Sequence, residues 1–178
     1  MKVRKAELSD LKEILDIVKG TFPQDFFYEG GFNKGKCAEF FMKSLTDPNE
    51  FVYICLEDGG KVCAFAYYVN KPPTNGTVIL EMQGVSKKFR YKGIGTRLLE
   101  ESDKLVVEDI KSQGIENLAT IHLTVSQNNL VAQKLYENVG YKPVGTIPGF
   151  VGNGNNEIVM LKVVNDINYR RDLWTSTT

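Results

Sequence analysis

The stretch that decides the fold runs from Thr77 to Gln113 and reads TVILEMQGV, SKKFRYK and GIGTRLLEESDKLVVEDIKSQ in three successive parts. β-branched and long apolar residues dominate the first part, which predicts a buried strand. In the third part, apolar residues recur at helical spacing and predict a long helix with one apolar stripe. They are Ile94, Leu98 and Leu105, together with Leu99, Val106 and Ile110. We therefore expect a strand, a short basic loop and a helix that starts on two glycines.

The junction between the loop and the helix has the features of an anion-binding turn. The first backbone N–H groups of a helix lack internal partners and lie at the positive end of its macrodipole. Gly93 and Gly95 would let a ligand approach this backbone closely, and residues 87–92 are rich in basic side chains. The turn lacks the Gly-Lys-Ser/Thr of a Walker A loop, and Leu98 stands where a dinucleotide fingerprint requires a third glycine. A phosphate cradle is predicted; the alternative is an ordinary helix start beside a solvated basic loop.

Two motifs resemble those of the GNAT superfamily of acyl-CoA N-acyltransferases. Arg90-x-x-Gly93-x-Gly95 is similar to its acetyl-CoA signature, Arg/Gln-x-x-Gly-x-Gly/Ala. A second stretch resembles its Leu-x-Val, Asn, Ala, Leu-Tyr, Gly-Phe/Tyr signature. The matching positions are Leu123, Val125, Asn129, Ala132, Leu135, Tyr136, Gly140 and Tyr141. Because the resemblance extends more loosely over residues 1–164, it implies one GNAT N-acetyltransferase domain there and a C-terminal tail over residues 165–178.

The resemblance and the order of the predicted elements imply an α/β fold, with a single mixed, mostly antiparallel sheet flanked by about four helices. Strands are expected over residues 3–6, 51–57, 61–69, 77–85, 119–125, 141–147 and 156–163, and helices over 10–20, 34–45, 93–113 and from 129 onward. In the family fold, the two parallel central strands splay apart to form the acetyl-CoA cleft, and a bulge helps to separate them. We place this bulge at Gly84.

The resemblance also implies the residues of the site. The Val85 N–H would donate to the thioester oxygen of acetyl-CoA, and Asn129 would cap its helix and contact the pantetheine arm. The pyrophosphate would be wrapped by Arg90, Tyr91, Lys92, Gly93, Ile94, Gly95 and Thr96. Glu81 resembles the family's general base and Tyr136 its general acid. The structural alternatives are a strand-end glutamate paired to a lysine and a tyrosine in the core of its helix.

The implied function is direct transfer of an acetyl group from acetyl-CoA, as co-substrate, to a primary amine of a small molecule. The alternatives are acetylation of a peptide or protein N-terminal amine, a non-catalytic acyl-CoA-binding sensor and, disfavoured by the second motif, a dinucleotide-binding protein. The loops over residues 22–32 and 148–156 would decide the acceptor, but neither carries a signature. His122, the only histidine, lies in an apolar strand and is interpreted as structural, so no metal site is expected.

Composition bounds the remaining properties. A chain of 178 residues that is 42% hydrophobic predicts one compact domain with a substantial core. Lys plus Arg (22) balance Asp plus Glu (22), which argues against a nucleic-acid partner. The apolar runs are too short for a membrane span, the N-terminus lacks a signal-peptide pattern, and the three cysteines have no metal-type spacing. These features predict a cytoplasmic protein with reduced thiols, and the family resemblance allows a homodimer.

Overall fold

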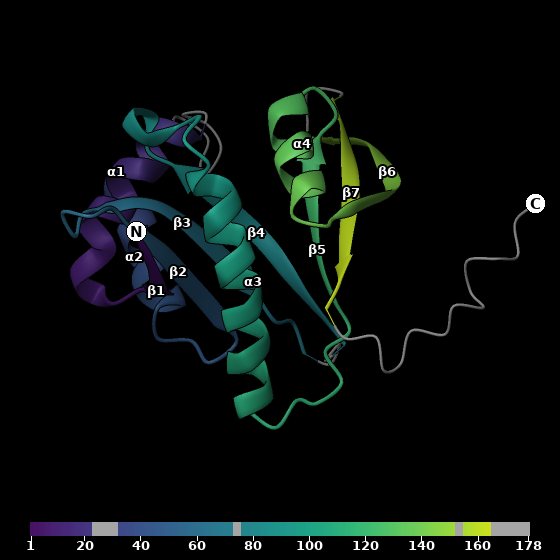
Figure 1. Ribbon diagram of the computed structural model, residues 1–178, viewed down its shortest axis with the longest axis horizontal. Helices are drawn as coiled ribbons and strands as arrows, with labels where there is room; N and C mark the ends of the chain where they lie inside the picture. Colours follow the sequence, from purple (N-terminus) through teal and green to yellow (C-terminus); the bar gives the residue numbers. More distant parts are fainter. Residues whose placement is uncertain (23–31, 73–75, 152–154, 165–178) are drawn as a thin grey trace, which may run out of the picture.

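The computed structural model describes residues 1–22, 32–72, 76–151 and 155–164 (Figure 1). The strands are β1 (Lys2–Lys5), β2 (Glu50–Leu56), β3 (Val62–Val69), β4 (Thr77–Val85), β5 (Thr120–Ser126), β6 (Lys142–Val151) and β7 (Asn155–Val163). The α-helices are α1 (Leu11–Thr21), α2 (Lys34–Ser44), α3 (Ile94–Ser112) and α4 (Leu130–Asn138), with 3-10 turns at Leu8–Asp10 and Lys87–Phe89. Every predicted strand and helix is present, and most of their ends lie within a few residues of the prediction.

The strands form one sheet in the order β1-β2-β3-β4-β5-β7-β6. Within the described residues, β4 and β5 are the one parallel pair, and α3 connects them as a crossover. Helices α1 and α2 pack on one face of the sheet and α3 on the other, so that an apolar core lies on each face (Figure 1). The predicted mixed, mostly antiparallel sheet with flanking helices is confirmed.

The two parallel strands stay together only at their beginnings. Residues Thr77–Ile79 of β4 pair with Thr120–His122 of β5, and no later residues of the two strands pair within the described part of the chain. Figure 1 shows the two strands meeting at the bottom of the sheet and diverging toward the top. Beyond this point β5 continues to pair with β7 over its whole length. The sheet is therefore split between β4 and β5, as the family fold implies.

A β-bulge at Glu81 accompanies this split. Tyr67 of β3 pairs with Met82, and its neighbour Tyr68 pairs with Leu80, so that Glu81 is an extra residue on β4. Leu80 consequently packs in the core beneath α3, whereas Met82 packs in the core beneath α1 and α2. The bulge thus reverses which face of the sheet each following side chain of β4 occupies.

The prediction of a bulge at Gly84 was wrong. Gly84 pairs in regular register with Phe65 of β3. A Cβ atom at position 84 would lie 2.8 Å from the ring of Phe65 and 3.2 Å from the side chain of Ile17 on α1. Glycine is required there because the phenylalanine ring and the helix pack directly on the strand.

A buried carboxylate on α3, that of Asp103, connects the two halves of the split sheet. Its Oδ1 accepts hydrogen bonds from the hydroxyls of Tyr68, at 2.7 Å, and Tyr141, at 3.0 Å, and its Oδ2 pairs with Lys162 Nζ at 2.7 Å. Tyr68 belongs to β3, whereas Tyr141 precedes β6 and Lys162 belongs to β7. Since Asp103 is only 2% exposed, these contacts join the halves away from solvent.

Some sequence-based expectations fall outside the described residues. The loop over residues 22–32 and the one over 148–156 lie partly outside them, and the tail over 165–178 lies wholly outside. No helix within the described ranges is long and apolar enough to cross a membrane. The three cysteines are buried and form no disulfide.

The replacement Asp103→Asn should lower the free energy of unfolding by about 2–3 kcal/mol, because the Lys162 ammonium loses its counter-charge and two tyrosine hydroxyls lose a charged acceptor. Urea denaturation measures this loss. The matched control is Glu101→Gln, which removes a half-exposed ion pair with Arg97 on the same helix and should cost only about 0.3–0.5 kcal/mol. Equal losses in the two variants would contradict the role given to Asp103.

Candidate active site

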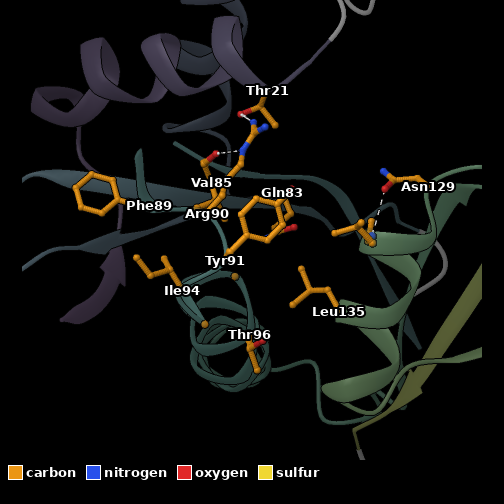
Figure 2. A pocket seen from close by; sticks show the side chains of 14 residues that line it. Thr21, Gln83, Val85, Phe89, Arg90, Tyr91, Ile94, Thr96, Asn129 and Leu135 are labelled. Carbon is orange, nitrogen blue, oxygen red and sulfur yellow. Dashed lines mark hydrogen bonds between the residues drawn. The ribbon is translucent and has the colours of Figure 1, made fainter. Parts of the chain in front are cut away.

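A cavity of about 450 Å³ lies where the end of β4, the turn before α3 and the start of α4 come together. Figure 2 shows Arg90 and Val85 on one side of this cavity, with Asn129 and Leu135 across from them. The lining residues are Thr21, Gln83, Val85, Phe89, Arg90, Tyr91, Gly93, Ile94, Gly95, Thr96, Asn129, Val131, Ala132 and Leu135. Eight of the nine predicted cofactor-binding residues are among them, the exception being Lys92.

The start of α3 opens into this cavity without a side-chain cap. Gly93 has the left-handed φ of 74°, and no side chain caps the first turn. Gly95 lies so close to its neighbours that a Cβ atom there would be 3.1 Å from Gln83 Nε2 and 3.2 Å from Leu135 Cδ2. The glycines therefore keep the first-turn N–H groups accessible, which is the arrangement that binds phosphate oxygens.

Arg90 lines the cavity but also holds parts of the protein together. Its Nε donates to the Val85 carbonyl oxygen at 3.1 Å, and its Nη2 donates to the Gly20 carbonyl oxygen at 3.3 Å and to Thr21 Oγ1 at 3.4 Å. The guanidinium thus joins the end of β4 to the end of α1 while leaving its charge beside the cavity. Lys92, in contrast, lies over the ring of Phe89, 5.6 Å from its centroid.

The backbone of Val85 is oriented toward the split. The Ser86 N–H donates to the Cys63 carbonyl oxygen, which makes Val85 and Ala64 a non-hydrogen-bonded pair between β4 and β3. The Val85 N–H and C=O consequently point away from β3, toward the side from which β5 has separated. The C=O is bonded to Arg90, whereas the N–H has no strand partner in the described residues.

Gln83 is a lining residue that the sequence analysis did not identify. Its Nε2 is buried and has no hydrogen-bond partner in the described part of the chain. A buried amide nitrogen without an acceptor is costly, so a ligand carbonyl or phosphate oxygen is a fitting partner for it. Strand alternation from Val85 could have identified Gln83. This orphan amide and the uncapped helix start fit the amide and phosphate groups of acetyl-CoA.

Helix α4 forms the opposite wall of the cavity. Asn129 Oδ1 accepts a hydrogen bond from the Ala132 N–H at 3.2 Å, which confirms the predicted helix cap (Figure 2). Tyr136, on the same helix, does not line the cavity; it is 9% exposed and packs edge-on against Tyr141 with ring centroids 5.9 Å apart. Burial raises the pKa of Tyr136 to about 12, so its hydroxyl keeps its proton over the ordinary pH range.

Glu81 lies on the same strand as Gln83 and Val85 but does not line the cavity. Its carboxylate is 37% exposed and pairs with Lys71 Nζ at 3.0 Å. Its electrostatic neighbours include Tyr67 and His122, whose side chains do not face α3. His122 shares a hydrogen bond of 2.9 Å with Thr77 through Nδ1, and burial lowers its pKa although Glu81 opposes this shift. Glu81 is therefore placed on the face opposite to Gln83.

No group of three or more His, Cys, Asp or Glu side chains in the described ranges is arranged to hold a metal ion. The site as described consists of backbone amides, two side-chain amides, a guanidinium, the hydroxyl groups of Thr21, Tyr91 and Thr96, and apolar walls.

The family model and the sequence relatives that match this chain are all acetyltransferases. The model of the acetyltransferase (GNAT) family matches residues 11–141. The N-alpha-acetyltransferases of Saccharolobus solfataricus and Sulfurisphaera tokodaii are 24% and 23% identical to this chain, covering 90% and 89% of it and 91% and 90% of their own lengths.

Solved structures agree in fold. A variant of the spermidine N-acetyltransferase SpeG from Vibrio cholerae superposes with a TM-score of 0.74 at 16% identity, over 92% of this chain and 95% of that one. A GNAT-family acetyltransferase from Streptococcus pneumoniae gives a TM-score of 0.70 at 21% identity, over 92% and 99%.

The replacement Gly95→Asp should weaken the binding of acetyl-CoA by about 100-fold, because a carboxylate would fill the cradle and repel phosphate. Titration calorimetry measures the dissociation constant. The control is Gly145→Asp on β6, outside the cavity lining, where a Cβ atom meets nothing within 4 Å and φ is not left-handed. If Gly95→Asp bound acetyl-CoA as tightly as the wild type, the cofactor would have to bind elsewhere.

Proposed function

Because this chain belongs to the acetyltransferase (GNAT) family and is an acyltransferase, we propose that it transfers the acetyl group of acetyl-CoA directly to the primary amine of a small molecule. One observation carries this proposal. The uncapped start of α3, the unpartnered amide of Gln83 and the free N–H of Val85 all border the same cavity at the split in the sheet.

The donor side of the reaction would use mostly backbone groups. When bound, acetyl-CoA supplies an acetyl group already activated as a thioester. The first-turn N–H groups of α3 would hold its pyrophosphate, with the charge of Arg90 nearby. The Val85 N–H would donate to the thioester oxygen as that oxygen gains negative charge, and one such donor is worth about 10²–10³ in rate.

Glu81 is the proposed proton acceptor. An aliphatic ammonium has a pKa of about 10.4, so that only on the order of 0.1% of the acceptor amine is neutral at pH 7. The Glu81 carboxylate would take the proton directly or through a water molecule. Its place at the bulge, where β4 leaves β5, supports this role because the amine must approach the split to reach the acetyl group.

Tyr136 is the proposed general acid for the departing thiolate. The raised pKa supports the role because the hydroxyl stays protonated and available as a donor. Its hydroxyl also has no hydrogen-bond partner among the described residues. The neighbouring wall residues Ala132 and Leu135 are apolar, which keeps water away from the proton transfer.

A second acceptor class is favoured by the sequence relatives. Two archaeal proteins named N-alpha-acetyltransferase match about nine-tenths of the chain. The α-amine of a peptide is therefore the alternative acceptor. A thiol-release assay with acetyl-CoA, run in parallel with small aliphatic amines and with short peptides that have free N-termini, distinguishes the two. No release with any amine or peptide, by folded protein that binds acetyl-CoA, would refute the proposed function.

The replacement Glu81→Gln should lower kcat/KM by about 100-fold at pH 7, because the carboxylate that accepts the proton is lost. The deficit should shrink as the pH approaches 10, where the amine becomes neutral unaided. Lys71→Met removes the same ion pair but keeps the carboxylate, and should retain most of the activity. A pH-independent deficit, or an equal one in Lys71→Met, would assign Glu81 a structural role instead.

The replacement Tyr136→Phe should lower kcat by about 10²–10⁴ while leaving the dissociation constant of acetyl-CoA within about threefold, because only the proton donor is removed. Steady-state kinetics and calorimetry measure the two quantities. Tyr53→Phe is the control, since Tyr53 is also buried, its hydroxyl donates to Asp109, and neither residue lines the cavity. A kcat that is unchanged in Tyr136→Phe would rule out the general-acid role.

A further inference from the structure

Glu157, at the start of β7, is a buried carboxylate without a counter-charge. It is 7% exposed, and in the described residues it forms no ion pair. The side chain of Thr124, on the neighbouring strand, favours its charged form. Burial raises the pKa of Glu157, and the contact with Thr124 only partly offsets this. A carboxylate held in this way gains stability when a cation binds to it.

The register of the strands places Glu157 on a particular face of the sheet. Glu157 pairs directly with Ser126 of β5, so the two side chains share a face, and Thr124 shares it by alternation. The opposite face carries Leu123, Val125 and Met160, which belong to the core beneath α3. The face of Glu157 is the one that α1 and α2 cover elsewhere on the sheet, but their core contains no residue of β5, β6 or β7.

The same face carries the proposed proton acceptor. Glu81 lies at the split on β4, and its electrostatic neighbour His122 is on the same face of β5 as Thr124. Across the sheet, the order is therefore Glu81, the split, Thr124 and Glu157. An acceptor amine that reaches the split beside Glu81 therefore meets the face of the sheet that also carries the Glu157 carboxylate.

The chemistry of the transfer restricts what Glu157 can hold. The amine that is acetylated must lose its positive charge before it attacks, so it cannot remain in an ion pair with a carboxylate. A second cationic group on the same acceptor keeps its charge throughout the reaction. A buried carboxylate on this face of the sheet would favour such a group as its partner.

We propose that Glu157 binds a second ammonium group of the acceptor, and that the enzyme therefore acts on aliphatic diamines and longer polyamines in preference to monoamines. This inference rests on the proposed small-molecule acetyltransferase function. Glu157 is a binding residue in this account and takes no proton from the reacting amine.

The test compares 1,4-diaminobutane with n-butylamine. The two have the same four-carbon chain, but n-butylamine lacks the second ammonium group. The wild type should use the diamine with a kcat/KM at least about 30-fold higher, since a desolvated charge pair contributes about that much to binding. In Glu157→Gln the preference should fall to about threefold or less, through KM, with kcat for the diamine nearly unchanged. Glu108→Gln, an exposed carboxylate on α3, is the matched control and should keep the preference.

Each other outcome decides against the inference. Equal use of both amines by the wild type would overturn it and leave the proposed function standing, whereas no thiol release with any amine or peptide would overturn the proposed function itself. A loss of kcat with both amines in Glu157→Gln, together with an altered acid limb of the pH profile, would make Glu157 a proton acceptor instead.

A further variant covers the case in which Glu157→Gln does not fold. Glu157→Asp retracts the carboxylate by one carbon, and should move the optimum in a series of diamines from three to eight carbons toward a longer chain. An unchanged optimum would contradict direct contact between the carboxylate and the second ammonium.

Discussion

The site depends on the separation of β4 from β5 after Ile79. In an unbroken sheet, each backbone group of β4 that points toward β5 would be bonded within the ladder. The split leaves the Val85 N–H without a strand partner in the described residues and gives space for the cavity beside it. The Glu81 bulge adds local twist to β4 at this point, which helps the strands to diverge.

A split sheet loses ladder hydrogen bonds, so other contacts must hold its halves in place. Asp103 does this from α3, because one carboxylate bonds to β3 through Tyr68 and to the β6/β7 side through Tyr141 and Lys162. At the open end, Arg90 satisfies the Val85 carbonyl and leaves the N–H free. The protein thus forms a hydrogen bond to the backbone oxygen that a ligand would not use, and keeps the N–H group available for a ligand.

The features that could be predicted from the sequence are those that depend on residues close together in the chain. The strand, the glycine turn and α3 follow from local periodicity and from Gly93 and Gly95, and so does the Asn129 cap. What depends on pairing between distant strands was not predictable. The bulge falls at Glu81 rather than Gly84 because of the register with β3, and the burial of Glu157 follows from its place beside β5. Gln83 lay within reach of the alternation argument but was missed.

This difference between local and distant contacts also distinguishes the proposed acetyl-CoA side of the site from the proposed acceptor side. The donor side is built from two short stretches, residues 83–96 and 129–135, so a family motif can report it. On the proposed acceptor side, Glu81 and Glu157 come from different strands, and Glu81 lies on the face opposite to Gln83 because the bulge reverses the alternation of β4 after it. In a strand without a bulge, positions 81 and 83 would share a face. In the proposed mechanism, the amine and acetyl-CoA would therefore approach the split from opposite faces of the sheet, so that both can be bound when the acetyl group is transferred.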